Sequence, residues 1–349
     1  MRRLSGQELL ELHGERDLVA LGRAADVARV KLHPEGVVTY VVDRNVNYTN
    51  GCVSGCRFCA YYRPAGHPEA FVLSLEELRA KCEEAKALGA TQVLLQGGLH
   101  PGLRIGFYRE MLGVIQAVGL HAHCFSPPEI VHLARLEGLT VRECLADLQA
   151  AGLDTLPGGG AEVLSDEVRS RVSPRKCTKT EWLEVMRQAH GLGMRTTATM
   201  MFGMGEEPRH RVEHLLAIRE LQDETGGFTA FIPWTFQPVN TALEGAVPSL
   251  GGHAYLRMLA VSRLALDNVP NVQASWVTQG GKIAQLALRF GANDMGSTMI
   301  EENVVRAAGV TYRLPRDEIV RLIEDAGFRA QQRDCYYGSV EQDGQDGAG

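Results

Sequence analysis

The amino-acid sequence predicts an α/β protein built as a (β/α)8 barrel of the TIM type, full or partial, with an N-terminal helix and a C-terminal extension. Strand-like segments rich in β-branched residues alternate with helix-like segments along most of the chain. Repeated βα units of this kind imply a parallel sheet with right-handed crossovers. About eight units can be distinguished. The chain has 349 residues, 45% of them hydrophobic, which is enough for one large barrel. A partial barrel of about six units with a C-terminal appendage is the alternative.

The first residues predict a helical segment ahead of the barrel. Ser5 and Glu8 have the spacing of a capping box, and the leucines that follow give the segment an apolar face. Val37–Val42 is β-branched and predicts the first strand, which runs toward a cysteine-containing loop. We therefore expect a helical segment over 1–36, the barrel with its C-terminal extension over 37–335, and a disordered, glycine-rich tail over 339–349.

The remaining strands and helices follow in alternation, each helix beginning near a capping or turn residue. The later strands are predicted at 91–96, 121–125, 153–156, 195–201, 228–233, 271–277 and 293–298. The helices are predicted at 74–90, 104–118, 128–151 with an interruption near Gly138, 180–192, 207–224, 252–268, 281–290 and 315–326.

Composition and charge exclude several classes of partner. The formal net charge is −6 and 22% of the residues are charged, so a nucleic acid or an anionic membrane has no electrostatic support. No run of about 18 apolar residues predicts a transmembrane helix, and the N-terminal residues lack the apolar core of a signal peptide. We expect a cytoplasmic protein. The five cysteines outside the motif described next are then predicted to be free, buried thiols.

Three cysteines, Cys52, Cys56 and Cys59, lie in a C-x3-C-x2-C pattern in the loop after the first strand. Three thiolates can hold three irons of a [4Fe–4S] cluster and leave the fourth iron open to a small molecule. A zinc site is the alternative, but zinc usually takes four ligands in paired motifs, and no second C-x2-C pair is found here. The pattern, with Phe58 between the last two cysteines, resembles the signature of the radical S-adenosylmethionine (SAM) superfamily, in which the open iron binds SAM.

Candidate SAM-binding residues follow the next three strands. The active site of a βα barrel lies at the carboxyl ends of its strands. Gln96, Gly97 and Gly98 follow the second strand and resemble the glycine-rich segment that contacts the SAM amino group in this superfamily. Ser126 and Glu129 follow the third strand, and a helix N-cap with an acidic first turn explains them equally well. Glu162 follows three glycines after the fourth strand, where superfamily members often place an acid that contacts SAM.

Polar and aromatic residues collect after the last three strands, and together they predict a pocket for a large, polar, ring-containing substrate. They lie in Trp234–Thr241, Ser275–Gly280 and Asn293–Asn303.

These segments resemble the cyclic dehypoxanthine futalosine synthase family over nearly the whole chain. The resemblance rests on Tyr40–Arg63, Ile232–Pro238, Gln273–Gly280 and Asn293–Asn303. It implies a step of menaquinone biosynthesis in which the 5′-deoxyadenosyl radical takes the ribose C4′ hydrogen of dehypoxanthine futalosine. The carbon radical then adds to the benzoate ring, and loss of one electron and one proton restores aromaticity.

The resemblance also implies roles for individual residues and partners. Asp294, Glu301 and Glu302 are candidates for the base or for substrate positioning, and Arg44 or Arg63 for the benzoate carboxylate. An external donor such as flavodoxin or ferredoxin is expected to supply electrons, and the sequence assigns no oligomeric state. The nearest rivals are aminofutalosine synthase and one half of the deazaflavin chromophore synthase. More distant rivals are a non-catalytic iron–sulfur electron carrier and a zinc-stabilised binding protein.

Overall fold

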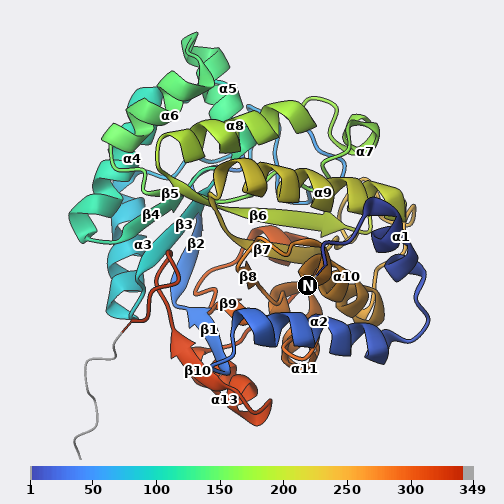
Figure 1. Ribbon diagram of the computed structural model, residues 1–349. Helices are drawn as coiled ribbons and strands as arrows, with labels where there is room; N and C mark the ends of the chain where they lie inside the picture. Colours follow the sequence, from blue (N-terminus) through green and yellow to red (C-terminus); the bar gives the residue numbers. More distant parts are fainter. Residues whose placement is uncertain (1, 341–349) are drawn as a thin grey trace, which may run out of the picture.

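The computed structural model of this chain describes residues 2–340 and consists of two parallel sheets surrounded by helices (Figure 1). The larger sheet has seven strands in the order β2-β3-β4-β5-β6-β7-β8, and the smaller has the order β10-β1-β9. The strands are β1 (Val37–Val41), β2 (Asp43–Asn47), β3 (Gln92–Gln96), β4 (His121–Cys124), β5 (Thr155–Leu156), β6 (Arg195–Phe202), β7 (Phe228–Thr235), β8 (Asn271–Val272), β9 (Asp294–Ser297) and β10 (Arg329–Gln332).

The two sheets together surround the interior of the molecule. The seven-stranded sheet is a curled half-barrel, and the smaller sheet joins both of its edges. At one edge, only Val42 separates β1 from β2. At the other, a bridge between Gln273 and Asp294 links the end of β8 to β9, which pairs with β1. A (β/α)8 barrel has eight strand positions. If β1 and β2 are counted as one of them, β3 to β9 occupy the other seven. The predicted parallel α/β barrel is confirmed.

Helices cover the outside of the barrel (Figure 1). The N-terminal segment is two helices, of which α1 packs against α9 and α2 against α10. The helices are α1 (Gly6–Gly14), α2 (Leu18–Leu32), α3 (Leu75–Ala87), α4 (Ile105–Val118), α5 (Pro127–Glu137), α6 (Val141–Ala150), α7 (Asp166–Val172), α8 (Lys179–Gly191), α9 (Pro208–Thr225), α10 (Gly252–Ala265), α11 (Trp276–Ala287), α12 (Val304–Ala307) and α13 (Arg316–Asp325).

The sequence prediction was wrong or incomplete in several places, most of them in the C-terminal third. The strand expected over 271–277 ends at Val272, and the helix α11 already begins at Trp276, with a kink at Gly280, where φ is 76°. The helices α7 and α12 and the strand β10 were not predicted. The β10 sequence, Arg-Ala-Gln-Gln, lacks the β-branched residues that mark a strand. Of the tail expected over 339–349, Ser339 pairs with Arg333, and residues 341–349 lie outside the described residues.

The alternation of side chains along the strands determines what faces the interior. On β3, Val93 and Leu95 are fully buried in the hydrophobic core, while Gln92, Leu94 and Gln96 line the interior. This is the two-residue period of a strand with two different faces. On β2, the same period directs Asp43, Asn45 and Asn47 inward. This wall of the barrel interior therefore carries several polar side chains.

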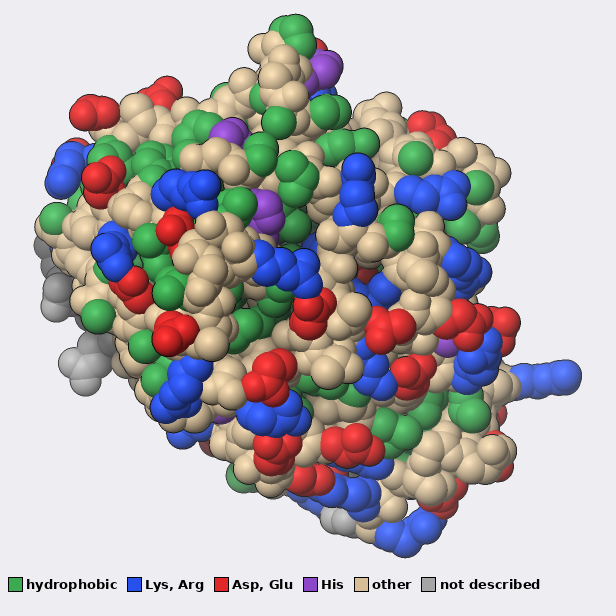
Figure 2. All heavy atoms as spheres, turned by 90° about the horizontal axis from the view of Figure 1, so that it is seen from above, with side chains coloured by type: hydrophobic (Ala, Val, Ile, Leu, Met, Phe, Trp, Pro, Cys, Tyr) green, Lys and Arg blue, Asp and Glu red, His purple; other side chains and the backbone are tan. Residues whose placement is uncertain are grey.

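The outer surface carries charges of both signs. Figure 2 shows acidic and basic side chains interspersed over one face, without a large region of a single sign. Among the described residues, no helix has the length and apolar character needed to span a membrane.

Candidate active site

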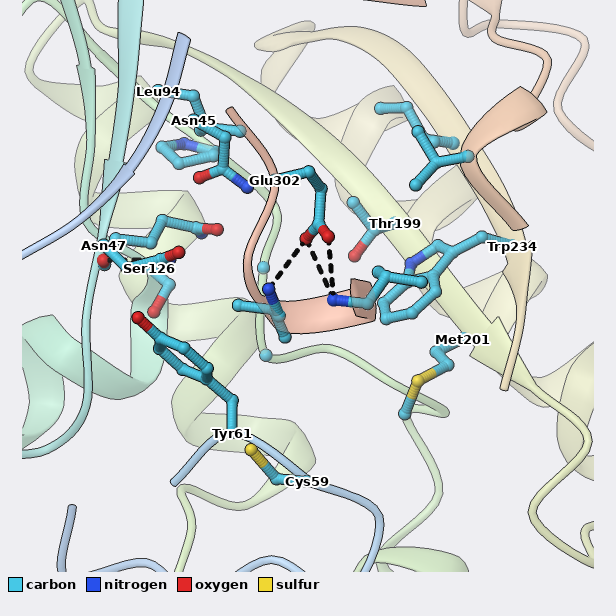
Figure 3. Close-up of a pocket in the computed structure, with 18 of the residues that line it drawn as sticks. Asn45, Asn47, Cys59, Tyr61, Leu94, Ser126, Thr199, Met201, Trp234 and Glu302 are labelled. Carbon is cyan, nitrogen blue, oxygen red and sulfur yellow. Dashed lines mark hydrogen bonds between the residues drawn. The ribbon is translucent and has the colours of Figure 1, made fainter. Parts of the chain in front are cut away.

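A cavity of about 430 Å³ occupies the interior of the barrel, between the cysteine loop that follows β2 and the C-terminal segment that follows β10. Side chains from opposite strands form its walls (Figure 3). The cavity is lined by all three motif cysteines and by eight other residues that the sequence predicted, namely Phe58, Gln96, Gly97, Gly98, Ser126, Glu129, Glu162 and Glu302. Asp294 and Glu301 do not line it.

Hydrogen bonds hold the cysteine sulfurs in place. Sγ of Cys52 accepts hydrogen bonds from the backbone N–H of Ser54 (3.4 Å) and Leu99 (3.3 Å). Sγ of Cys56 lies 3.0 Å from Oγ of Ser54. Burial raises the pKa of the Cys56 thiol to about 11, and it also raises the pKa of Cys59. A bound cation at these sulfurs would therefore offset a desolvation cost that the free thiolates bear.

These donors fit a [4Fe–4S] cluster better than a zinc ion. A cubane takes one cysteine per iron and is tuned by hydrogen bonds to sulfur, and such bonds are present at Cys52 and Cys56. A zinc ion instead needs its ligands to converge on one point. Among residues 2–340, no three His, Cys, Asp or Glu side chains converge in this way.

Two glycines allow the cysteine loop to pack closely on the end of β3. A Cβ on Gly98 would lie 2.3 Å from the carbonyl oxygen of Gly51, and one on Gly97 would lie 2.5 Å from the ring of Tyr48. Any larger residue would displace one of these neighbours. The backbone N–H of Gly98 donates to the carbonyl of Thr49 (3.0 Å). The glycine pair is therefore needed for the position of the cysteine loop, independently of any other contact that the pair makes.

Glu129 connects the glycine pair to the end of β4. Its carboxylate accepts hydrogen bonds from the Tyr48 hydroxyl (2.8 Å), the Gly97 N–H (3.0 Å) and the Ser126 hydroxyl. Burial raises the pKa of Glu129 to about 7, although the three hydrogen bonds lower it. Phe125, just before Ser126, has a φ of 65°, a strained conformation for an aromatic residue that is often found at functional sites.

Glu162 forms part of a buried charge cluster that the sequence did not reveal completely. Its carboxylate lies 2.8 Å from Nζ of Lys176 and 3.4 Å from Nη1 of Arg169. Burial alone would lower the pKa of Lys176, but the charges of Glu162 and Cys56 outweigh it and raise the pKa. Lys176 also lies 5.4 Å from the centre of the Phe58 ring. This lysine places a positive charge beside the cysteine loop.

The three acids predicted as base candidates have different surroundings. Glu302 lines the cavity and accepts backbone N–H bonds of 3.0 Å from Val304 and Val305 (Figure 3). Burial raises its pKa despite these bonds. Glu301 lies outside the cavity, paired with Lys81 and Arg44 at 2.7 Å each.

Asp294 lies near the amino end of β9, on the side away from the cysteine loop. It forms a buried ion pair with Arg333 and accepts a hydrogen bond of 2.6 Å from the Thr39 hydroxyl. It therefore joins β1, β9 and the segment after β10 to one another.

Several lining residues were not proposed from the sequence. Asp43, His123 and Arg333 all line the cavity. Burial raises the pKa of Asp43 and lowers that of His123 to about 3. The two-residue period of Asp43 and Asn45 was the signal that would have identified Asp43. Of the arginines proposed for a carboxylate, Arg44 and Arg63 do not line the cavity and are paired with acids.

Comparisons with known proteins agree with this geometry. A model of the radical SAM superfamily matches residues 46–218, and a model described as the CofH/MqnC C-terminal region matches residues 225–345. The crystal structure of methylornithine synthase (PylB) has a TM-score of 0.74 and 19% sequence identity, with 94% of each chain covered. At this identity the likeness shows the fold alone.

Two curated relatives cover almost the whole chain. A cyclic dehypoxanthine futalosine synthase from Halalkalibacterium halodurans is 45% identical over 337 residues, which are 96% of this chain and 91% of that protein. A 5-amino-6-(D-ribitylamino)uracil–L-tyrosine 4-hydroxyphenyl transferase from Methanopyrus kandleri is 43% identical over 344 residues, 96% of this chain and 93% of that protein. This chain belongs to the radical SAM superfamily, and within it to the family that includes the cyclic dehypoxanthine futalosine synthases.

Proposed function

We propose that this protein is a radical SAM cyclase that converts dehypoxanthine futalosine to its cyclic form. The observation that carries the proposal is one cavity that joins the three-cysteine loop to the barrel interior, in a chain 45% identical to a cyclic dehypoxanthine futalosine synthase. The cavity extends from the cysteine loop to Arg333 and Cys335 after β10, so its walls offer contacts to a substrate as well as to SAM.

The protein residues have three tasks in this reaction. Cys52, Cys56 and Cys59 would hold the [4Fe–4S] cluster, which together with SAM would supply a 5′-deoxyadenosyl radical. The Gly97–Gly98 backbone and the acids Glu129 and Glu162 form the SAM side of the cavity, with Gln96, Ser126 and Phe58 as neighbouring contacts. The barrel walls exclude water and hold the substrate beside the radical carbon, which is the main contribution of the protein in cofactor enzymes.

The proposed reaction balances in hydrogen and electrons. When bound, the cluster and SAM would supply the radical, with one electron from an external donor such as flavodoxin or ferredoxin and with methionine as the other product. The radical takes one hydrogen atom from the substrate and becomes 5′-deoxyadenosine. After ring closure the substrate would lose one proton to a base and one electron to a one-electron carrier such as the oxidised form of the external donor, so the product is two hydrogens lighter. We propose Glu302 as the base for this proton, since among the three acids suggested by the sequence it alone lines the cavity, with Asp43 as a second candidate.

A second activity is supported by the near-equal identity of the transferase from Methanopyrus kandleri. That protein bears the name of an enzyme acting on 5-amino-6-(D-ribitylamino)uracil and L-tyrosine. The same cysteines and SAM-side residues would serve both reactions. The substrate-side walls of the cavity, which include Trp234, Trp276 and Glu302, would then decide between the two reactions.

We also propose a cytoplasmic location, because all eight cysteines are unpaired, as in reducing compartments.

Anaerobic turnover tests the proposal. The cluster-reconstituted protein is mixed with SAM, a strong reductant and dehypoxanthine futalosine, and the products are followed by mass. Deoxyadenosine with a product two hydrogens lighter than the substrate is expected. A parallel reaction contains L-tyrosine and 5-amino-6-(D-ribitylamino)uracil instead. A coupled product there, with none from dehypoxanthine futalosine, would assign the second activity.

A further inference from the structure

Two buried amide oxygens in the cavity lack hydrogen-bond partners. They are Oδ1 of Asn45 on β2 and Oε1 of Gln92 on β3, and neither has a partner among the described residues. The two side chains are 7% and 4% exposed, and both line the cavity. Buried polar atoms in folded proteins are almost always satisfied, so each exception calls for an explanation such as a ligand or water. These two lie together on neighbouring strands.

The arrangement of their neighbours identifies the missing partner as a hydrogen-bond donor. Nε2 of Gln92 donates a hydrogen bond of 2.9 Å to Oδ2 of Asp43, which leaves the carbonyl oxygen of that amide as the unpartnered atom. No described residue bonds either polar atom of the Asn45 amide, so in either orientation this side chain presents an unmet group. A ligand bound here must therefore donate a proton to Gln92, and a hydroxyl group would satisfy Asn45 in either orientation because it both donates and accepts.

The charges around the two amides disfavour a carboxylate. Asp43 places an acid at this end of the cavity, and Arg333, the one arginine among the described lining residues, is already paired with Asp294 outside the cavity. Arg333 also donates a hydrogen bond of 3.0 Å to the carbonyl of Asp334. An added anion would face the Asp43 carboxylate and an arginine that is already paired, at a site where burial strengthens repulsion. Neutral hydroxyl groups satisfy both the charge and the hydrogen-bond requirement.

We propose that Asn45 and Gln92 form a hydroxyl-binding subsite that receives the ribose-derived ring of the substrate, and that the benzoate carboxylate points away from it. This inference rests on the proposed function, since it deepens the account of the same cavity. The second relative gives independent support, because the name of its substrate contains a ribityl group, which also carries hydroxyls. A hydroxyl-binding subsite would suit both members of the family, while the other walls of the cavity set the reaction.

Paired changes in the protein and the substrate test this assignment. The wild type and the Asn45→Ala variant are compared with dehypoxanthine futalosine and with analogues that lack one ring hydroxyl. In the wild type, loss of the hydroxyl that meets Asn45 should lower kcat/KM about tenfold or more. In the variant, kcat/KM should be almost the same for this analogue and for the full substrate, because the protein partner of that hydroxyl is already gone. Gln92→Leu provides the same comparison for the second amide.

Two controls keep the result clear. Each variant must retain the iron content and the unfolding temperature of the wild type, and Gln92→Leu serves if Asn45→Ala does not fold. Equal losses of kcat/KM on the full substrate and on every analogue, in both variants, would overturn the subsite.

If the wild type makes no cyclised product, the proposed function fails separately. The subsite is then tested by calorimetry on the SAM-bound protein, where 5-amino-6-(D-ribitylamino)uracil should bind at least tenfold more tightly than its ribityl-free analogue, and equal affinity would overturn it.

Discussion

Nζ of Lys176 donates a hydrogen bond of 2.8 Å to Oε1 of Glu162 at the edge of the cavity beside the cysteine loop. The lysine comes from the loop between α7 and α8, and the acid follows β5. Both line the cavity. The pair therefore supplies one fixed positive and one fixed negative group on the side of the cavity assigned to SAM, whose methionine part carries both an ammonium and a carboxylate.

The Lys176→Met substitution should weaken SAM binding. It removes the positive group and leaves Glu162 with Arg169 alone, at 3.4 Å. Loss of a hydrogen bond to a charged group typically costs enough to raise the Kd about tenfold or more. Equilibrium dialysis with the reconstituted protein measures this directly. Lys179→Met is the matched control, because Lys179 has a similar bond of 2.9 Å to Glu213 on the outer surface, and it should leave the Kd unchanged.

The Cys56→Ala variant should fail to assemble the cluster. Two remaining thiolates would hold only two irons of the cubane. Two signals are measured after anaerobic reconstitution. They are the iron content per chain and the broad absorption at about 400 nm that is typical of such clusters. Cys144→Ala removes a thiol buried on α6 and should retain both signals. A fully assembled cluster in Cys56→Ala would remove this cysteine from the ligand set.

The sequence predicted residues whose role depends on local spacing, and it missed those that the fold brings from far along the chain. The glycine pair and Glu129 lie within a few residues of a predicted strand end, which is where a βα barrel places its site, and the cysteines form a motif that their own spacing reveals. Lys176 and Arg333 lie in loops and reach the cavity only through long-range packing. Nothing in their neighbouring sequence indicates this position.

The different positions of Glu301 and Glu302 also have a physical cause. Glu301 and Glu302 are adjacent, but only Glu302 caps the short helix α12 from inside the cavity, while Glu301 turns outward to Lys81 and Arg44. Their order in the sequence does not indicate which of the two faces inward, because the segment between β9 and α12 is irregular.

Glu129 should make folding stability depend on pH. Burial raises its pKa from 4.5 to about 7, against hydrogen bonds from Ser126, Tyr48 and Gly97. The folded state then binds more protons than the unfolded state between these pH values, so this contribution to stability is complete below pH 4.5 and is lost as the pH rises toward 7. The difference corresponds to roughly 3 kcal/mol.

The Glu129→Gln variant should lose this dependence, because its amide keeps the shape and an acceptor oxygen without titrating. Urea unfolding of both proteins at several values between pH 5 and about 7.5 covers the window. The wild type should become less stable relative to the variant as the pH rises. Parallel pH profiles for the two proteins would show that Glu129 does not titrate in this range.

Glu302→Gln should uncouple hydrogen abstraction from product formation. If Glu302 accepts the final proton, the variant should still form deoxyadenosine while the cyclised product falls about 100-fold or more. Both products are quantified by mass in one anaerobic reaction. Glu301→Gln is the control, since that carboxylate lies outside the cavity, and its product ratio should match the wild type. A normal ratio in Glu302→Gln would shift the assignment to Asp43.

The buried pair of Arg333 and Asp294 should dominate the attachment of the C-terminal segment to the barrel. Both side chains are almost completely buried, at 6% and 0% exposed. Arg333→Met would leave Asp294 charged, buried and supported by the Thr39 hydroxyl and the Gly296 N–H, which typically costs about 3–5 kcal/mol. The double variant Arg333→Met with Asp294→Asn should recover most of this loss, because no unpaired charge remains.

Arg321→Met, on an exposed pair of α13, is the control and should change the unfolding free energy by less than about 0.5 kcal/mol. Urea unfolding distinguishes these outcomes, and equal stabilities for Arg333→Met and Arg321→Met would mean that the pair does not anchor the segment.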